Sequence, residues 1–397
     1  MGTPEGIQGT RNPFRTRTCW HHQRMRCRIP LPEDRPWRVL GLMSGTSADG
    51  VDVAAVTVDP AAFPDGRPCL ALLGHHATPY PEALKAEVLA AASNRLDPAG
   101  LCILQRRLGD HHARAAANLC AALDLKPDLA ALHGQTVQHH PAQGASLQLA
   151  DPYVLAEALG CPVVWDLRRR DLALGGQGAP LVPLPERWLR GADPWLALNL
   201  GGIANLAAWD GTQLRAWDTG PGMSMLDLAA HRWLGQAFDP GGAAASGLVH
   251  QDLLDRWMQH PYFRQAPPKS TGREVFGEAW LQAEAAEMET LPVADRLATL
   301  AAFSAESVAR EVARLGPQVA TARGLVSGGG SLHGRLRAEL ARRLPLILEN
   351  DLTFPTGSRE AVSWALLGAA SALGLPGNLP GVTGAARPAA LGSWVWP

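Results

Sequence analysis

The sequence predicts a two-lobed α/β protein in which a β-turn-β unit occurs twice, with a cleft between the lobes. Residues 37–44 and 51–59 are rich in β-forming residues, and a tight polar turn joins them. The same plan of strand, glycine-rich turn and strand returns within residues 195–210. Because glycine-rich turns of α/β folds are common ligand sites, we expect a ligand where these turns converge.

The segments after the first unit continue the α/β pattern. Apolar spacing predicts a third strand at 69–76 and helices at 81–93 and 98–124. Short strands are expected at 129–133, 146–149 and 162–166, with a helix that begins near Pro152. The segment GGQGAP, residues 175–180, is expected to be a loop.

The second unit is also followed by helices. Residues 214–222 read as a strand that enters a glycine turn, with a helix beginning near Met223. RGLVSGGGS is typical of a strand and a triple-glycine loop, and LHGRLRAELARRL of the helix after it. Further helices are predicted at 250–259, 277–290, 295–315 and 359–374, the last of them mostly buried.

The chain is expected to divide into three parts. Residues 1–37 carry many arginines and no sustained apolar stretch, which indicates a basic leader without fixed structure. We expect ordered structure from about Trp37, with a first lobe of residues 38–165 plus about 378–397. Residues 166–377 would form the second lobe.

Composition narrows the class of protein. The 397 residues are 46% hydrophobic and 18% charged, with a net charge of −1, which indicates a soluble enzyme or binding protein. The body of the chain is slightly acidic, so we expect no nucleic-acid partner, and no apolar run is long enough to span a membrane. The six cysteines form no C-x-x-C pair, which suits a reducing cytoplasm, and the histidines match no zinc spacing.

Four turns of small residues are candidate phosphate sites, because their backbone N–H groups can approach an anion closely. They are residues 45–50, 201–205, 220–222 and 328–331. The last two each follow a strand and open a helix, which adds the positive end of a helix. No Walker P-loop is present. Together the turns predict a nucleotide phosphate chain as ligand.

Phosphoryl transfer also needs carboxylates, which organise Mg²⁺ and accept a proton. Asp49 and Asp52 flank the first turn. Asp218 ends an apolar strand, where a carboxylate is either a general base or a cap on the following helix. Glu360 opens the last long helix, and taken alone it is a first-turn charge.

Several motifs, in order along residues 38–390, resemble those of the anhydro-N-acetylmuramic acid kinases, a family of the sugar kinase, Hsp70 and actin superfamily. They are MSGTSADGVD (43–52), HGQT (133–136), DLRRRD (166–171), GGQGAPL (175–181), NLGG (199–202), DTGPG (218–222), KSTGRE (269–274) and GGG (328–330). The resemblance implies a two-lobed actin-like ATPase fold, also called ribonuclease H-like. It further implies an ATP-dependent enzyme of peptidoglycan recycling and amino sugar metabolism, which forms a homodimer in the cytoplasm.

The implied reaction opens the 1,6-anhydro bond of 1,6-anhydro-N-acetylmuramic acid with water and phosphorylates O6, giving N-acetylmuramic acid 6-phosphate and ADP. By resemblance, Asp218 takes a proton from the attacking water, and Arg170 and Glu360 face the sugar. His133 is either a further sugar contact or a histidine satisfied by the adjoining loop. The predicted nucleotide contacts are Gly45, Thr46, Ser47, Ala48, Asp49, Gly50, Val51, Asp52, Gly201, Gly202, Gly328, Gly329 and Gly330.

Three positions depart from the family pattern. Met223 and His333 stand where the family usually has Asn, and Leu167 where it usually has Phe. Met223 has no amide, so a polar contact is missing or comes from elsewhere, such as Ser224. These departures leave two alternatives beside the kinase: a non-catalytic sensor of nucleotide or muropeptide sugar, which the intact Asp218 opposes, and a kinase for a different amino sugar.

Overall fold

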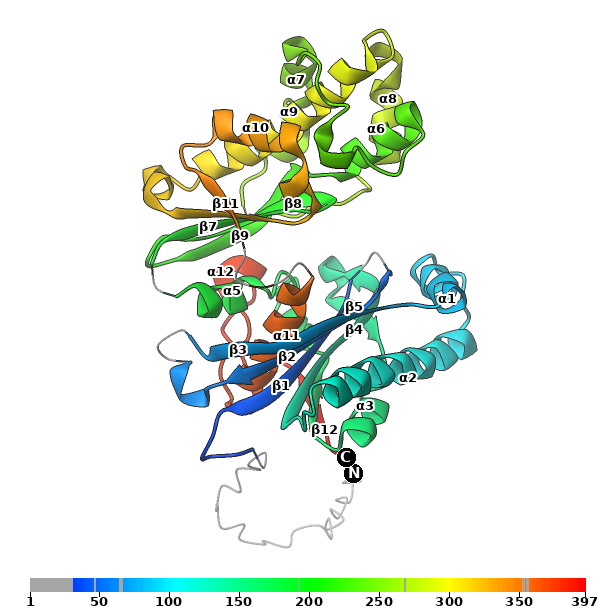
Figure 1. Cartoon of the computed structure of the whole chain (residues 1–397), viewed down its shortest axis with the longest axis vertical. Helices are drawn as coiled ribbons and strands as arrows, with labels where there is room; N and C mark the ends of the chain where they lie inside the picture. Colours follow the sequence, from blue (N-terminus) through cyan, green and yellow to red (C-terminus); the bar gives the residue numbers. More distant parts are fainter. Residues whose placement is uncertain are drawn as a thin grey trace, which may run out of the picture. The chain divides into compact units, whose positions relative to one another are not determined.

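The computed structural model describes residues 31–45, 48–63, 67–191, 193–267, 269–351, 354 and 357–397. The predicted basic leader falls within residues 1–30 for its greater part and so lies outside the described residues. Residues 31–397 group into one compact unit. Within it the described residues build two β-sheets, each accompanied by helices (Figure 1).

The first sheet contains the first β-turn-β unit. Strands β1 and β2 pair antiparallel, β3 pairs with β2, and β4 runs parallel to β1 on its other side. The sheet order is β12-β6-β4-β1-β2-β3, and β5 pairs with β4. The strands are β1 (Trp37–Ser44), β2 (Gly50–Val58), β3 (Cys69–Pro79), β4 (Leu129–His140), β5 (Ala145–Leu149), β6 (Val163–Trp165) and β12 (Ser393–Val395).

The second sheet repeats this plan. Its order is β11-β10-β7-β8-β9, in which β7, β8 and β9 form an antiparallel meander and β10 runs parallel to β7. The strands are β7 (Trp195–Leu200), β8 (Ile203–Trp209), β9 (Leu214–Pro221), β10 (Arg323–Ser327) and β11 (Leu348–Asn350). The order β6-β4-β1-β2-β3 therefore corresponds to β11-β10-β7-β8-β9, which confirms the predicted duplication.

The helices lie close to their predicted positions. Their starts follow local signals: the Asp97 side chain accepts a hydrogen bond from the Gly100 N–H, and Pro98 takes the first helical position of α2. The helices are α1 (Glu82–Ala92), α2 (Pro98–Ala122), α3 (Pro152–Leu159), α4 (Arg169–Ala173), α5 (Pro183–Arg190), α6 (Ser224–Leu234), α7 (Gln251–Trp257), α8 (Glu278–Met288), α9 (Val293–Ala313), α10 (Gly334–Arg343), α11 (Ser358–Ala372) and α12 (Pro380–Thr383).

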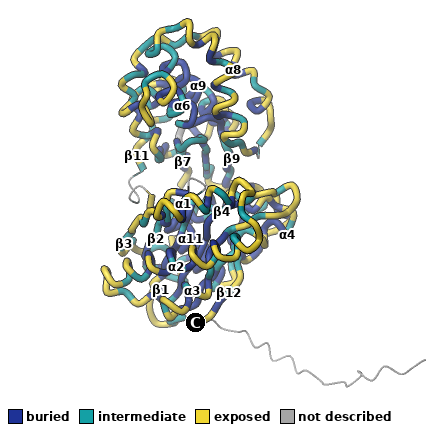
Figure 2. Tube along the Cα trace, turned by 90° about the vertical axis from the view of Figure 1, so that its right-hand side faces the viewer, coloured by how far each residue is buried: buried dark blue, intermediate teal, exposed yellow. Residues whose placement is uncertain are grey.

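Both faces of the first sheet are covered. Leu104, Leu108 and other residues of α1–α3 pack on one face, and α5 and α11 cover the opposite face (Figure 1). Trp364 of α11 is 1% exposed, and Figure 2 shows the buried residues that run along β4 and α11. Strands buried on both faces explain the nearly continuous apolar runs of β1 and β4.

Helix α5 was predicted in the second lobe with the rest of residues 166–377, but its Trp188 belongs to the core of the first sheet. Helix α11 differs from the predicted division in the same way. It packs on β1, β2 and β4 of the first sheet. A Cβ atom on Gly41 of β1 would lie 1.8 Å from the Ala361 carbonyl oxygen, so only glycine permits this close approach. Strand β12 pairs with β6, as expected for a first lobe that includes the C-terminal residues.

Candidate functional site

Three buried polar side chains, those of Ser44, Tyr80 and Gln135, hold the turn after β1 in place. The Ser44 hydroxyl lies 2.5 Å from the Tyr80 hydroxyl, 2.8 Å from Gln135 Oε1 and 2.7 Å from the Gly50 carbonyl oxygen. Gln135 Nε2 donates to the Gly45 carbonyl at 3.0 Å. Both ends of the turn are therefore anchored, while Thr46 and Ser47, two predicted nucleotide contacts, lie outside the described residues.

Ala48 and Asp49 shape the remainder of this turn. Ala48 has a φ of 55°, a left-handed conformation that non-glycine residues seldom adopt away from functional sites and tight turns. Its N–H donates to the Gly45 carbonyl oxygen at 3.2 Å. The Asp49 side chain is 72% exposed and pairs with Lys85 at 3.1 Å, so this carboxylate faces solvent at the edge of the turn.

Asp52, on β2, is paired. Its Oδ1 lies 2.9 Å from His75 Nε2 of β3. Val51 beside it is 1% exposed and belongs to the core, and Gly50 lies so close to Thr78 and Pro79 that a Cβ there would clash with their backbone. At Gly50 and Val51 the predicted motif therefore serves the fold, and only their backbone could contact a ligand. Asp52 is the one residue of this stretch whose side chain could do so.

His133 lies at an irregularity between β1 and β4. Leu42 pairs with Leu132, whereas Ser44 pairs with Gln135, so the chain bulges at His133 and Gly134. The His133 ring stacks on Trp364, with ring centres 4.5 Å apart. Burial, with a smaller contribution from Arg168, lowers the pKa of His133 well below its ordinary value, so the ring is neutral.

Arg168, two residues before the predicted sugar contact Arg170, contacts the group around His133. Its Nε donates to His133 Nε2 at 2.9 Å, and its Nη1 donates to the Gly178 carbonyl at 2.9 Å. Burial lowers the pKa of Arg168 to about 10, which leaves it cationic at neutral pH. No carboxylate lies within ion-pair distance of Arg168 among the residues that the structure describes. Arg170 is exposed on α4.

Glu360 opens α11 near this group. The Glu360 side chain keeps contact with solvent. Neighbouring protein atoms nevertheless remove part of its hydration, and this desolvation raises its pKa. The cation of Arg168 opposes this rise, and the negative charge of Asp52 adds to it. The structure therefore brings Asp52, His133, Arg168 and Glu360 into one electrostatic group on the first sheet.

Asp218 sits at a second bulge. Asp218 pairs with Asn205 and Gly220 with Ala204, so Thr219 is the extra residue of β9. Bulges re-aim neighbouring side chains and are frequent next to active sites. Three contacts fix Asp218: Thr271 N–H donates to its Oδ2 at 3.0 Å, the Tyr262 hydroxyl donates to its carbonyl at 2.6 Å, and its own N–H donates to the Lys269 carbonyl at 3.2 Å.

The surroundings of Asp218 suit a base. Burial raises its pKa to about 6; the Thr271 N–H opposes this shift and the charge of Glu274 adds to it. Met223, not Asp218, is the residue that precedes α6, and its side chain makes no capping hydrogen bond. The alternative reading of Asp218 as the cap of this helix is therefore wrong.

Lys269 of the KSTGRE motif is a structural residue. Its Nζ lies 2.8 Å from Glu311 Oε1 and 4.4 Å from the centre of the Tyr262 ring. Glu311 is fully buried on α9 and also accepts a hydrogen bond from Trp217 Nε1 at 2.9 Å. This buried ion pair ties the loop that contains Thr271 to α9, beside the strand that carries Asp218.

The second glycine turn supports the start of α6. The Gly201 carbonyl accepts from Met223 N–H at 2.7 Å, and the Gly202 carbonyl accepts from Gly222 N–H at 2.9 Å and Ser224 N–H at 3.0 Å. These amides at residues 222–224 are thus used within the fold, contrary to the expectation that this helix start receives phosphate. The Ser224 hydroxyl donates to the Phe276 carbonyl at 3.3 Å, so Ser224 does not replace the amide that Met223 lacks.

The triple-glycine turn follows β10 and packs on β7. A Cβ on Gly328 or Gly330 would lie 2.7 Å from atoms of Leu200, whereas one on Gly329 would meet nothing within 4 Å. Gly329 is therefore the open point of this turn.

His333 caps α10, since its Nδ1 accepts from Leu336 N–H at 3.2 Å, the role that an asparagine commonly takes. Leu167 is buried in the core of the first sheet, where an apolar side chain suffices.

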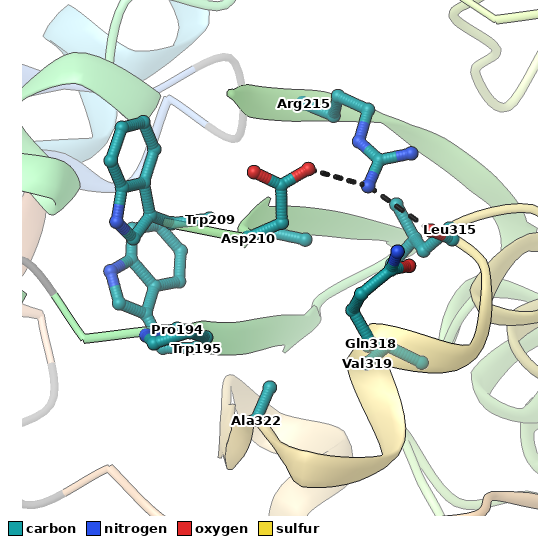
Figure 3. Close-up of a pocket in the computed structure, with 10 residues that line it drawn as sticks. Pro194, Trp195, Trp209, Asp210, Arg215, Leu315, Gln318, Val319 and Ala322 are labelled. Atoms are coloured by element: carbon teal, nitrogen blue, oxygen red, sulfur yellow. Dashed lines mark hydrogen bonds and ion pairs between the residues drawn. The ribbon is translucent and has the colours of Figure 1, made fainter. Parts of the chain in front are cut away.

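The structure does not bring all predicted site residues into contact. Within the described ranges, no hydrogen bond or ion pair links Asp218 with the group of Asp52, His133, Arg168 and Glu360. In the same part of the chain no three histidine, cysteine or acidic side chains cluster as a metal site, and no helix is long and apolar enough to cross a membrane. The cavity drawn in Figure 3 lies between Trp195, Asp210, Arg215 and Gln318 and contains none of the predicted site residues.

The two sheets of the described residues share one strand order, which is the arrangement of a two-lobed actin-like ATPase fold. A model of the anhydro-N-acetylmuramic acid kinase family matches residues 37–397. The chain belongs to this family, and it is a sugar kinase. Membership does not favour the alternative of a non-catalytic sensor.

Relatives agree over nearly the whole chain. A protein of Synechococcus sp. (strain CC9605) named anhydro-N-acetylmuramic acid kinase is 44% identical over 379 residues, which is 90% of this chain and 99% of the relative. One of Streptomyces avermitilis with the same name is 42% identical over 374 residues, 90% of this chain and 94% of the relative. Among solved structures, the (R)-2-hydroxyglutaryl-CoA dehydratase component A of Acidaminococcus fermentans aligns with a TM-score of 0.41 and 12% identity, covering 85% of this chain and 99% of that one.

Proposed function

We propose that this protein opens the anhydro ring of 1,6-anhydro-N-acetylmuramic acid with water and phosphorylates O6 from ATP, in the recycling of peptidoglycan. The observation that carries the proposal is Asp218: a carboxylate at a bulge, fixed by the Thr271 N–H, with its pKa raised to about 6. A base with such a pKa is mostly ionised at neutral pH and still accepts a proton readily.

The chemical steps balance without a further reactant. Asp218 takes one proton of a water molecule, whose oxygen forms a bond to C1 of the sugar while its other proton stays on the new C1 hydroxyl. The C1–O6 bond breaks, and its electron pair remains on O6. O6 then attacks the γ-phosphorus, ADP leaves, and Asp218 releases its proton to solvent. Ring opening thus produces the nucleophile beside the phosphate, a gain in proximity.

The ATP phosphates would lie at the turn of residues 45–52 and at Gly328–Gly330. The anchored Gly45 turn and the unobstructed Gly329 support this placement, because backbone N–H groups need close access to phosphate. Gly201 and Gly202 could contribute only their N–H groups, since their carbonyls are engaged.

Mg²⁺ would be held mainly by phosphate oxygens, with one or two carboxylates. This arrangement is usual for Mg²⁺ at nucleotide sites. The exposed Asp49 is the proposed protein ligand. When bound, the ion would offset negative charge on the transferred phosphoryl group.

The sugar would bind at the group on the first sheet. Glu360 can accept hydrogen bonds from sugar hydroxyls, as the family pattern predicts. His133 is buried and accepts Arg168 Nε, so it would act on the sugar through Arg168. The lactyl carboxylate of the sugar needs a cation. We assign this contact to Arg168, because it is recessed beside His133 and has no carboxylate partner among the described residues, whereas Arg170 is exposed.

Three Arg→Lys variants test this assignment. Arg168→Lys is expected to raise the KM for the sugar about 10- to 100-fold, the effect of a lost charge-assisted hydrogen bond, with the KM for ATP within about twofold. Arg170→Lys is expected to have a smaller effect, and Arg169→Lys, at an exposed ion pair with Asp166, none. Steady-state kinetics with either substrate varied measures all three. A larger sugar effect in Arg170→Lys than in Arg168→Lys would return the contact to Arg170.

Incubation of the full chain with Mg-ATP and the anhydro sugar tests the reaction itself. We expect ADP and a sugar 6-phosphate in equal amounts. ADP formed only with other amino sugars would indicate a kinase of different specificity. Tight binding of both ligands without turnover would contradict the proposed reaction.

The same assay has an expected pH dependence. Asp218 must be ionised to act as a base, so kcat/KM should fall as the pH falls through about 6 and lie about tenfold below its plateau at pH 5. A rate that is constant between pH 5 and 8 would contradict the role of Asp218.

The proposal includes a cytoplasmic homodimer. Cys69, Cys102, Cys120 and Cys161 are free thiols, which suits a reducing compartment. The dimer is implied by the family resemblance, and the mass of the particle in analytical ultracentrifugation measures it.

A further inference from the structure

Arg359 occupies a junction of four segments. Its Nη1 donates to the Ser327 hydroxyl at 3.0 Å, at the end of β10 and directly before Gly328. Its guanidinium also pairs with Asp351, in the segment after β11, and with Glu186 of α5. Arg359 itself is the second residue of α11, and the next residue is Glu360. The Arg359 side chain thus contacts β10, the strand that leads into the triple-glycine turn. Its neighbour in the chain is Glu360, the proposed sugar-binding residue.

The junction is buried and charged. The side chains of Arg190 and Glu186 are each 6% exposed, and that of Asp351 is 1% exposed. Arg190 pairs with both acids at 2.5 Å. The two arginines and two acids balance in charge, so Arg359 can change its partners within the junction without leaving a net charge behind.

Glu186 offers Arg359 a second arrangement. The buried Oε1 of Glu186 has no hydrogen-bond partner within the described residues, and Arg359 Nε stands 3.5 Å away from it. A buried acceptor without a donor costs free energy, so a short movement of Arg359 towards Glu186 is compensated by the new hydrogen bond. Ser327 holds the guanidinium in the arrangement that the structure shows.

We propose that Arg359 is a positioning residue that couples the nucleotide turn to Glu360, so that a nucleotide at Gly328–Gly330 strengthens binding of the sugar. This inference rests on the proposed function, which places nucleotide at that turn and sugar at Glu360. Nucleotide would hold the turn, and with it the Ser327 hydroxyl, against Arg359. The start of α11 and the Glu360 carboxylate are then set before the sugar arrives. The positive charge of Arg359 also favours the ionised form of Glu360.

Ser327→Ala removes the contact with Arg359 without changing any charge; the only other hydrogen bond of this hydroxyl within the described residues, a long one of 3.4 Å to the Leu198 carbonyl of β7, is lost with it. Isothermal titration calorimetry on the full chain would measure the Kd of the anhydro sugar with and without a saturating, non-hydrolysable ATP analogue and Mg²⁺. In the wild type the analogue is expected to tighten sugar binding about fivefold or more, within the usual range of coupling between sites. In Ser327→Ala this ratio should fall below about twofold, while the Kd of each ligand alone changes by less than about twofold.

Two further variants sharpen the result. Arg359→Lys keeps the charge beside Asp351 but has a single nitrogen, so it should also lose the coupling. Ser371→Ala, on the same helix, removes a buried hydroxyl that bonds only to the Leu391 carbonyl among the described residues, and it should keep the full ratio. In steady-state kinetics the loss should appear as a higher KM for the sugar at an unchanged kcat.

The outcomes separate the two proposals. A wild type that binds both ligands with no coupling, or a Ser327→Ala variant with the wild-type ratio, overturns the role of Arg359 and leaves the proposed function standing. Loss of coupling in Ser371→Ala to the same extent also overturns it. A wild type that binds no anhydro sugar overturns the proposed function itself.

Discussion

Asp218→Asn is expected to lower kcat by about 10²- to 10⁴-fold, the usual effect of losing a general base. The amide has nearly the same shape as the carboxylate, and its oxygen can still accept the Thr271 N–H that now reaches Asp218 at 3.0 Å. The proposed nucleotide turns are elsewhere in the fold, so the Kd for ATP should stay within about twofold. Rapid-quench measurement of sugar 6-phosphate and calorimetric titration of ATP check the two parts.

Asp210→Asn is the matched control. Asp210 belongs to the turn between β8 and β9, the same hairpin that carries Asp218, and it bonds to Thr212, Gln213 and Arg215. Those bonds lower the pKa of Asp210 to about 2, with the Gln213 N–H as the largest cause, so it is no base at neutral pH. The control should retain wild-type kcat. Near-normal turnover in Asp218→Asn would remove Asp218 from the mechanism.

Lys269→Met is expected to lower the free energy of unfolding by about 3 kcal/mol, because it leaves the buried Glu311 carboxylate without its nearest cation. Arg314 lies 3.3 Å from the same oxygen and Trp217 bonds to the other, so the loss should fall at the low end of the usual 3–5 kcal/mol. Urea unfolding followed by tryptophan fluorescence measures it. The loop that holds Thr271 should loosen as well, and kcat should fall with it.

Lys85→Met gives the comparison for stability. Lys85 pairs with Asp49 at the surface, and exposed pairs of this kind contribute about 0–1 kcal/mol. Equal losses of stability in the two variants would show that the Lys269–Glu311 pair is no more important to the fold than a surface pair.

Local patterns predicted the secondary structure well. The repeated strand-turn-strand plan predicted both meanders, and β1 has the bounds, 37–44, that the sequence indicated. The register between paired strands could not be predicted, because the position of a bulge depends on contacts with the neighbouring strand. Both bulges, at His133 and at Thr219, are therefore features that only the structure reveals.

The site was predicted in its parts but not in its contacts. The motif DLRRRD offers three consecutive arginines, and only the direction of the chain after β6 decides that Arg168 points inward and Arg170 outward. Lys269 stands out through the KSTGRE motif, yet its partner Glu311 lies 42 residues away on a helix with no motif. Long-range pairs of this kind leave no signal in a single sequence.

The close packing of α11 on Gly41 has a consequence for biosynthesis. Residues 358–372 cover a face of the sheet whose first strand begins at Trp37, and β12 at Ser393–Val395 completes its edge. The ribosome therefore releases β1 more than 300 residues before α11, the helix that covers it, emerges. The second sheet, whose strands span Trp195 to Asn350, can finish folding earlier, although its residues are translated later than most of the first.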